Sequence, residues 1–109
     1  MIWGKLWNKK APAVDFPKAF DADGNVLGMI VGVTLLKCAN GYAGIPENNP
    51  AFEVPAGTDG TVVHISSSDE VIVEVRSEQS PVGTLLAYVK PSDVRLDPWY
   101  LEENKSNHA

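Results

Sequence analysis

The chain has few of the residues from which metal sites and many catalytic sites are built. Its 109 residues include one cysteine, Cys38, and two histidines, His64 and His108. A single cysteine excludes an internal disulfide, and scarce cysteine weakly favours a cytoplasmic location. Zinc needs several Cys or His ligands at suitable spacing, and these three residues fall short of that requirement. We therefore predict a cytoplasmic protein without a metal ion or a cofactor.

Long apolar runs are also missing. The longest, residues 29–36, has eight residues and is interrupted by Gly32 and Thr34, whereas a transmembrane helix requires about 20. The N-terminus has neither a continuous apolar stretch nor a small-residue cleavage site, so it does not resemble a signal peptide. We expect no membrane span.

The histidines and the cysteine do not form a recognisable catalytic set. His64 stands between Val63 and Ile65, so in a strand it points to solvent when those two side chains face a core. Free cysteine is usually buried. Lys37 would point to the opposite face of a strand and could not activate the Cys38 thiol directly. We interpret Cys38 as an inert structural residue.

Two further patterns have ordinary structural interpretations. Glu70 and Glu74 fall on one face of an alternating strand, which suggests a solvated edge rather than an acid–base pair. Gly57 and Gly60 lack the Lys-Ser/Thr that completes a phosphate-binding loop. We predict no catalytic residue and no enzymatic activity.

Charge is distributed unevenly along the chain. Residues 1–20 hold four lysines and one aspartate, a net charge of +3, which leaves −8 for residues 21–109. Non-specific affinity for nucleic acid comes largely from neutralising phosphates, so an acidic body makes nucleic acid a poor partner. The negative charge favours solubility or a basic protein partner.

The first 25 residues are predicted to form an N-terminal extension with a short helix and a turn. Apolar residues at helical spacing are followed by Pro12, which would end the helix: Ile2, Trp3, Leu6 and Trp7. A helix this short needs a docking surface. That surface is either the barrel of the same chain or a partner protein or membrane, helped by the nearby lysines.

Residues 21–25, DADGN, predict a tight turn, because Asp, Asn and Gly favour the backbone angles of a reversal. The same residues resemble the start of a calcium-binding loop. However, the required glycine would fall on Val26 and the bidentate glutamate on Gly32. The turn is therefore the preferred interpretation.

Five short strands are predicted after this turn. They are Met29–Cys38, Gly57–Ile65, Glu70–Arg76, Thr84–Lys90 and Val94–Leu96. The first two are separated by a long connection over residues 39–56, and a 3₁₀ turn is expected at residues 91–93.

This order predicts a mostly β domain, a small five-stranded SH3-like barrel over residues 26–101, with a flexible tail at 102–109. Gly57 and Gly60 would let a strongly bent strand pass between the two halves of the barrel. An OB-fold usually needs a helix between its third and fourth strands. Residues 77–83 leave no room for one.

The strand motifs resemble a family of small bacterial SH3-like domains of unknown function. They are GTDGTVV at 57–63, VIVEV at 71–75, LLAYV at 85–89 and DVRL at 93–96, with VTLL at 33–36 as the leading strand. Such domains are often encoded in mobile or toxin-linked gene neighbourhoods. The resemblance covers residues 33–96 and implies an antitoxin-like or immunity role.

Aromatic residues are the candidate partner-binding side chains, namely Trp3, Trp7, Tyr42, Phe52, Trp99 and Tyr100. The segment 41–52 corresponds to a loop that helps form the aromatic groove of peptide-binding SH3 domains. Because no acidic cluster followed by tryptophan accompanies it, we expect it instead to pack over the mouth of the barrel.

Together these features predict a non-enzymatic protein-interaction module, antitoxin-like or assembly-related, that binds an unidentified protein or associates with itself. The alternative is a nucleic-acid-binding accessory protein that uses its basic, Trp-containing N-terminus. A third possibility is an enzyme whose site is completed by another chain.

Overall fold

The computed structural model describes residues 17–100, which form a mostly β structure with two short 3₁₀ helices. Nine strands lie in this part of the chain: β1 Ala19–Phe20, β2 Val26–Leu27, β3 Gly32–Leu35, β4 Ala39–Tyr42, β5 Phe52–Val54, β6 Asp59–Ser67, β7 Glu70–Arg76, β8 Thr84–Val89 and β9 Val94–Leu96. The 3₁₀ helices are η2 Pro46–Asn48 and η3 Pro91–Asp93.

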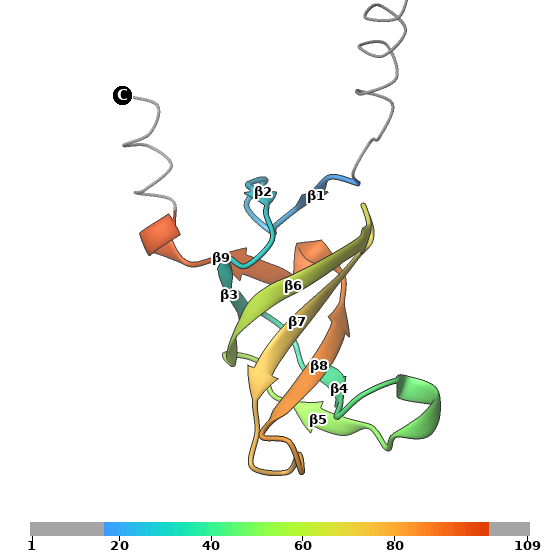
Figure 1. Ribbon diagram of the computed structural model, residues 1–109. Helices are drawn as coiled ribbons and strands as arrows, with labels where there is room; N and C mark the ends of the chain where they lie inside the picture. Colours follow the sequence, from blue (N-terminus) through green and yellow to red (C-terminus); the bar gives the residue numbers. More distant parts are fainter. Residues whose placement is uncertain (1–16, 101–109) are drawn as a thin grey trace, which may run out of the picture.

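Seven of the strands form one antiparallel sheet in the order β5-β4-β8-β7-β6-β3-β9. The sheet curls into a half-barrel (Figure 1). Its two edge strands, β5 and β9, are not hydrogen-bonded to each other, so the barrel stays open. The remaining strands, β1 and β2, form a small hairpin at one end.

The core fills the concave side of the curled sheet with aliphatic side chains. In β7, Val71, Val73 and Val75 are buried, while Glu70, Glu74 and Arg76, which alternate with them, are exposed. This alternation confirms the predicted faces of the strand. The other buried apolar residues are Ala19, Leu27, Val33, Leu35, Val54, Val62, Leu85, Ala87, Val89, Val94 and Leu96.

Two β-bulges shape the long strand β6. Val63 and Ser66 have no partner on β7, because the register shifts by one residue at each position. Without the first bulge, Val62 and Ile65, three residues apart, would face opposite sides of the sheet. With it, Val62 is fully buried and Ile65 also packs on the core.

Four of the predicted strands lie close to their expected bounds, and the fifth does not. The strand expected over Met29–Cys38 is confined to Gly32–Leu35. A turn at Met29–Ile30 precedes it, and a bend at residues 36–37 follows it. Apolar and β-branched composition alone predicted a longer strand, because composition does not show where the backbone must turn.

The predicted connection over residues 39–56 is itself mostly structured. It contains β4 and β5, which pair with each other, and β4 also pairs with β8. The predicted total of five strands is therefore too low. The two short strands were not predicted because prolines and asparagines lie between them. In addition, β4 pairs with β8, which is distant in the sequence.

The segment between β4 and β5 extends away from the sheet (Figure 1). It contains η2, in which no residue is buried. This differs from the expected packing over the mouth of the barrel. The physical reason is composition: Glu47 and Asn48 on η2 are better solvated than buried.

The turn at residues 21–25 joins β1 and β2, as predicted, and its hairpin crosses the boundary that the sequence suggested at residue 25. Ala19 and Leu27, a directly opposed pair, are both buried in the core. The backbone N–H of Ala22 donates to the carbonyl of Val94 at 2.9 Å. The hairpin is thus attached to the edge strand β9.

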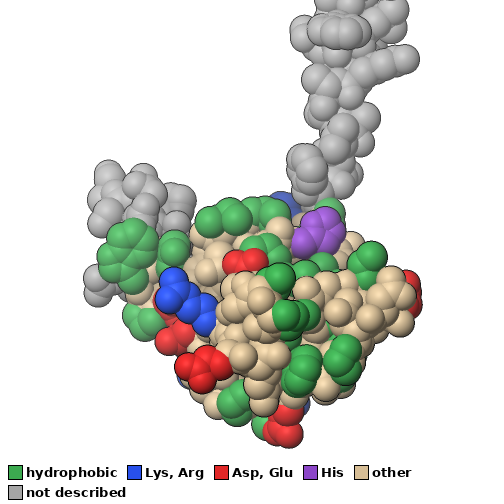
Figure 2. Space-filling view, turned by 60° about the horizontal axis from the view of Figure 1, so that its bottom comes forward, with side chains coloured by type: hydrophobic (Ala, Val, Ile, Leu, Met, Phe, Trp, Pro, Cys, Tyr) green, Lys and Arg blue, Asp and Glu red, His purple; other side chains and the backbone are tan. Residues whose placement is uncertain are grey.

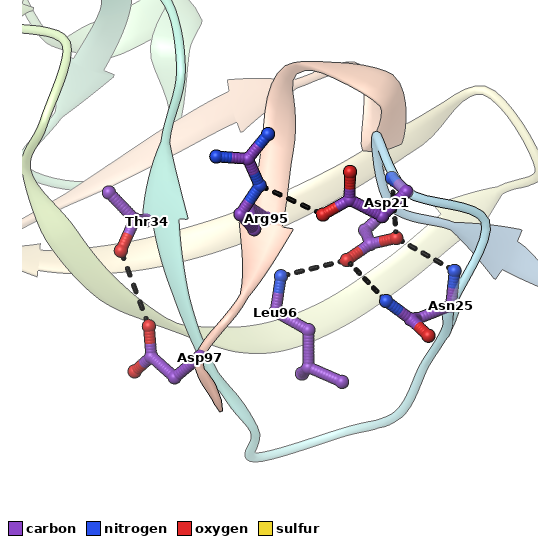
Figure 3. A network of polar contacts seen from close by, with 7 residues as sticks. Asp21, Asn25, Thr34, Arg95, Leu96 and Asp97 are labelled. Atoms are coloured by element: carbon purple, nitrogen blue, oxygen red, sulfur yellow. Dashed lines mark hydrogen bonds and ion pairs between the residues drawn. The ribbon is translucent and has the colours of Figure 1, made fainter. Parts of the chain in front are cut away.

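The Asp21 carboxylate organises this turn (Figure 3). Its Oδ1 accepts the backbone N–H groups of Asp23 at 2.9 Å and Asn25 at 2.7 Å. Its Oδ2 accepts the N–H of Leu96 at 2.9 Å and the side-chain amide of Asn25 at 3.3 Å. Burial would raise the pKa of Asp21, but these hydrogen bonds together outweigh burial and lower the pKa below its usual 3.8.

Candidate functional site

The candidate aromatic residues lie in separate places. Trp3 and Trp7 lie outside the described residues. Tyr42 on β4 is half-buried, and its ring meets Tyr88 on β8 edge to face with centroids 6.0 Å apart. Phe52 on β5 packs against the core. The structure therefore pairs Tyr42 with Tyr88 rather than with the aromatic residues near the end of the chain.

Trp99 and Tyr100 form a second aromatic pair, in a helical turn that follows β9. Their rings are perpendicular, with centroids 5.0 Å apart. Trp99 is 65% exposed, whereas Tyr100 is half-buried and packs on the core. This turn and β4 lie on opposite sides of the half-barrel (Figure 1), so the aromatic candidates do not form one groove.

Tyr100 borders a surface groove of about 670 Å³, which we call the acidic groove. Strands β3, β6, β7 and β8 and the segment that follows β9 contribute its walls. The residues that define it are Gly32, Asp59, Glu74, Arg76, Asp97 and Tyr100.

Two carboxylates of the acidic groove converge on one hydroxyl. Thr34 Oγ1 lies 2.8 Å from Asp59 Oδ1 and 3.3 Å from Asp97 Oδ1; Figure 3 shows the contact with Asp97. A hydroxyl has one proton, so at any moment it donates to only one of the two carboxylates. Two negative groups are therefore held close together with a single neutral donor between them.

The charge of the acidic groove is negative. Three carboxylates and the guanidinium of Arg76 give a net charge of −2. Within residues 17–100, ion pairs join Lys37 to Asp93 and Arg95 to Asp23, and neither involves a groove residue. Figure 2 shows acidic and basic side chains next to each other at the left of the face drawn, beside a group of hydrophobic side chains.

Asp97 and Tyr100 meet above Gly32. A Cβ atom at Gly32 would lie 2.5 Å from Asp97 Oδ2 and 3.1 Å from Tyr100 Cε2. The absence of a side chain at this position therefore lets a carboxylate and an aromatic ring approach the same point. A carboxylate beside an aromatic ring suits an arginine or lysine side chain whose charged group lies over the face of that ring.

The sequence did not reveal this groove. Asp59 begins β6 and Asp97 follows β9, and they meet only because both strands pair with β3. No spacing rule joins residues so far apart in the chain. The one available signal was the glycine in an otherwise apolar strand, since Gly in a strand often marks a close approach by another group.

Two residues considered for catalysis, His64 and Cys38, are exposed. His64 is exposed, as predicted, with Ile65 on the core side. Cys38 is exposed, although free cysteine is usually buried; its interpretation as an inert residue stays a prediction. The strand that would have buried Cys38 ends at Leu35, and the bend at residues 36–37 carries the chain out of the sheet.

Among the described side chains, no group of three or more His, Cys, Asp or Glu residues is arranged to hold a metal ion. No helix within residues 17–100 combines the length and the apolar character needed to cross a bilayer. Comparison of the chain with protein-family models, curated proteins and solved structures found no match.

Proposed function

We propose that this protein is a non-enzymatic interaction module whose acidic groove binds an arginine- or lysine-containing segment of a partner protein. The observation that carries the proposal is the meeting of the Asp97 carboxylate and the Tyr100 ring at Gly32. A guanidinium placed there gains a charge-assisted hydrogen bond and a contact with an aromatic ring.

The neighbouring groups support the same ligand chemistry. Asp59 shares the Thr34 hydroxyl with Asp97, so a cation between the two carboxylates would relieve their mutual repulsion. Exposed Trp99 adds apolar surface at the edge of the groove, next to Tyr100. The charge of −8 over residues 21–109 would also steer a basic partner toward the domain.

We also propose that the half-barrel is an SH3-like barrel. The curled sheet, with a 3₁₀ helix before its last strand, suits a partly open SH3-like barrel. The resemblance to small bacterial SH3-like domains supports an antitoxin-like or assembly-related role. In that role the partner, rather than a substrate, would occupy the groove.

The proposal is tested by NMR titration of the full chain with a synthetic Arg-Gly repeat peptide at low salt. We expect shifts in the amide signals of Gly32, Asp59, Glu74 and Asp97, and weaker binding as salt rises. The double variant Asp59→Asn/Asp97→Asn should abolish these shifts. Both substitutions keep the size of the side chain and an oxygen that can accept from Thr34.

The matched control is Asp69→Asn/Glu70→Gln, which also removes two negative charges, but at the turn between β6 and β7. This control should bind the peptide like the parent, with an unchanged thermal midpoint. Shifts that map elsewhere, or that survive in Asp59→Asn/Asp97→Asn, would contradict the proposal. Salt-dependent binding of a single-stranded DNA oligonucleotide in place of the peptide would instead favour the nucleic-acid alternative.

A further inference from the structure

The end of the half-barrel that carries the β1–β2 hairpin exposes several large apolar side chains. Phe20 and Val26 are directly opposed on the hairpin, so they lie on the same face, away from buried Ala19 and Leu27. Met29 and Ile30 follow shortly after β2. We call this set the hairpin end; its members are 48% (Phe20), 56% (Val26), 51% (Met29) and 64% (Ile30) exposed.

Ile30 is held in a strained conformation at this surface. Its φ is 61°, in the left-handed region that β-branched residues rarely adopt. Such a conformation is unfavourable and persists only where surrounding contacts impose it. Here the N–H of Ile30 donates to the carbonyl of Val62 at 2.7 Å. The aliphatic side chain of Ile30 is nevertheless exposed to water. Covering this side chain with another apolar group would therefore be favourable.

A hollow of about 510 Å³ lies beside Phe20 at this end. Its other walls come from the turn between β6 and β7 and from η3, and they include Asp69, Lys90 and Pro91. The hollow therefore has an aromatic wall and one side chain of each charge. It is suited to an apolar side chain flanked by polar or charged groups.

We propose that residues 1–16 of the same chain fold back and cover the hairpin end. Their apolar residues at helical spacing supply a complementary stripe: Ile2, Trp3, Leu6 and Trp7. The described chain begins at Pro17, two residues before β1. Residues 1–16 are therefore joined to the chain beside the surface that they would cover. Its three lysines and one aspartate give +2, against −7 for the rest of the chain.

Chain length permits this arrangement. Trp7 lies ten positions before Pro17, and an extended chain of that length spans about 33–36 Å. A segment tethered this closely has a high effective concentration at the hairpin end, which favours the same chain over a second copy. The acidic groove lies elsewhere and shares no residue with the hairpin end, so the two proposals stand or fall separately.

The test uses the full chain carrying Trp99→Phe, in which Trp3 and Trp7 are the only tryptophans left. Acrylamide quenching reports how accessible these two indoles are. We expect them to be shielded, with blue-shifted emission that does not depend on protein concentration. Val26→Asp in this background should cause a red shift and loss of shielding, because it places a charge in the proposed contact.

The matched control is Val82→Asp, which changes an equally apolar residue that is 69% exposed in the turn between β7 and β8. It should leave quenching unchanged. In the unmodified chain, Trp3→Ala/Trp7→Ala should shift the amide signals of Phe20 and Val26 without lowering the thermal midpoint of the barrel. This second measurement does not require any change within the described fold.

Several outcomes would overturn the proposal. Indoles as accessible as free tryptophan would show that the segment is not docked, and equal effects of Val26→Asp and Val82→Asp would show that it docks elsewhere. Shielding that grows with protein concentration would assign the contact to a second copy. Shielding that appears only after anionic lipid vesicles are added would assign it to a membrane.

Discussion

The Asp21 carboxylate accepts the backbone N–H of Leu96 at 2.9 Å, at the outer edge of strand β9. The N–H of Ala22 donates to the carbonyl of Val94 on the same edge. The Asp21 carboxylate and the Ala22 N–H therefore bind one donor and one acceptor of β9 that would otherwise be free to pair with a further strand. The hairpin thereby protects an edge that could pair with another chain.

Asp21→Asn should destabilise the protein by about 1.5–3 kcal/mol, the range typical of hydrogen bonds to a charged acceptor. Asp21 accepts four N–H groups, and an amide cannot accept at both of its terminal atoms. One nitrogen of the new side chain must therefore face a donor. Chemical denaturation of the variant and the parent measures the difference.

The control for this variant is Asp23→Asn, in the same turn. Asp23 pairs with Arg95 at 2.8 Å, but both side chains are about half exposed. Because exposed ion pairs contribute about 0–1 kcal/mol, this variant should be close to the parent. Equal losses in the two variants would show that the buried carboxylate has no special role.

The lowered pKa of Asp21 predicts a dependence of stability on pH. A carboxyl whose pKa is lower in the folded than in the unfolded state stabilises the fold above the unfolded value, near 3.8. That contribution is lost as the pH falls from there through the folded value. The stability gap between the parent and Asp21→Asn should therefore be constant from neutral pH to about pH 5 and shrink below pH 4. A gap that widened in acid would contradict the assignment.

Gly60→Ala should destabilise the sheet by about 1–3 kcal/mol, as overpacking of a core does. A Cβ atom there would lie 2.5 Å from Val73 Cγ1 and 2.8 Å from the carbonyl oxygen of Glu74. The backbone oxygen cannot move without disturbing the β6–β7 pairing. Thermal or chemical unfolding measures this effect.

Gly28→Ala is the comparison for that variant. A Cβ atom at Gly28 meets only Val31 Cγ1, at an ordinary 3.8 Å. The substitution should be neutral or stabilising by up to about 1 kcal/mol, because alanine has less freedom in the unfolded chain. A loss at Gly28 as large as that at Gly60 would point to a general cost of replacing glycine rather than to steric contact.

Cys38 should react with a thiol reagent such as Ellman's reagent in the native protein, because its side chain is exposed. Cys38→Ser should change the free energy of unfolding by no more than about 0.5 kcal/mol. A thiol that reacts only after addition of denaturant would contradict the exposed position. That outcome would be typical of the burial that is usual for free cysteine.

Features that depend on neighbouring residues were predicted from the sequence, whereas features that depend on residues distant in the chain were missed. Alternation in residues 70–76 identified β7 and its buried face, and the Pro91–Asp93 3₁₀ turn and β9 were found within their bounds. Each depends on neighbours in the chain. Strands β4 and β5 were missed because three or four residues among prolines and asparagines carry little periodicity, and pairing with β8 makes them strands.

The amino-acid sequence by itself determined a mostly β chain, the alternation that builds its core, the turn at residues 21–25 and the separation of positive and negative charge. Only the tertiary structure decided that Asp59 and Asp97 share one hydroxyl, that Asp21 caps the edge of β9, and that Cys38 is exposed. Local patterns follow from steric preferences of adjacent residues. Convergence of distant side chains depends on strand register, here on the pairing of β3 with both β6 and β9.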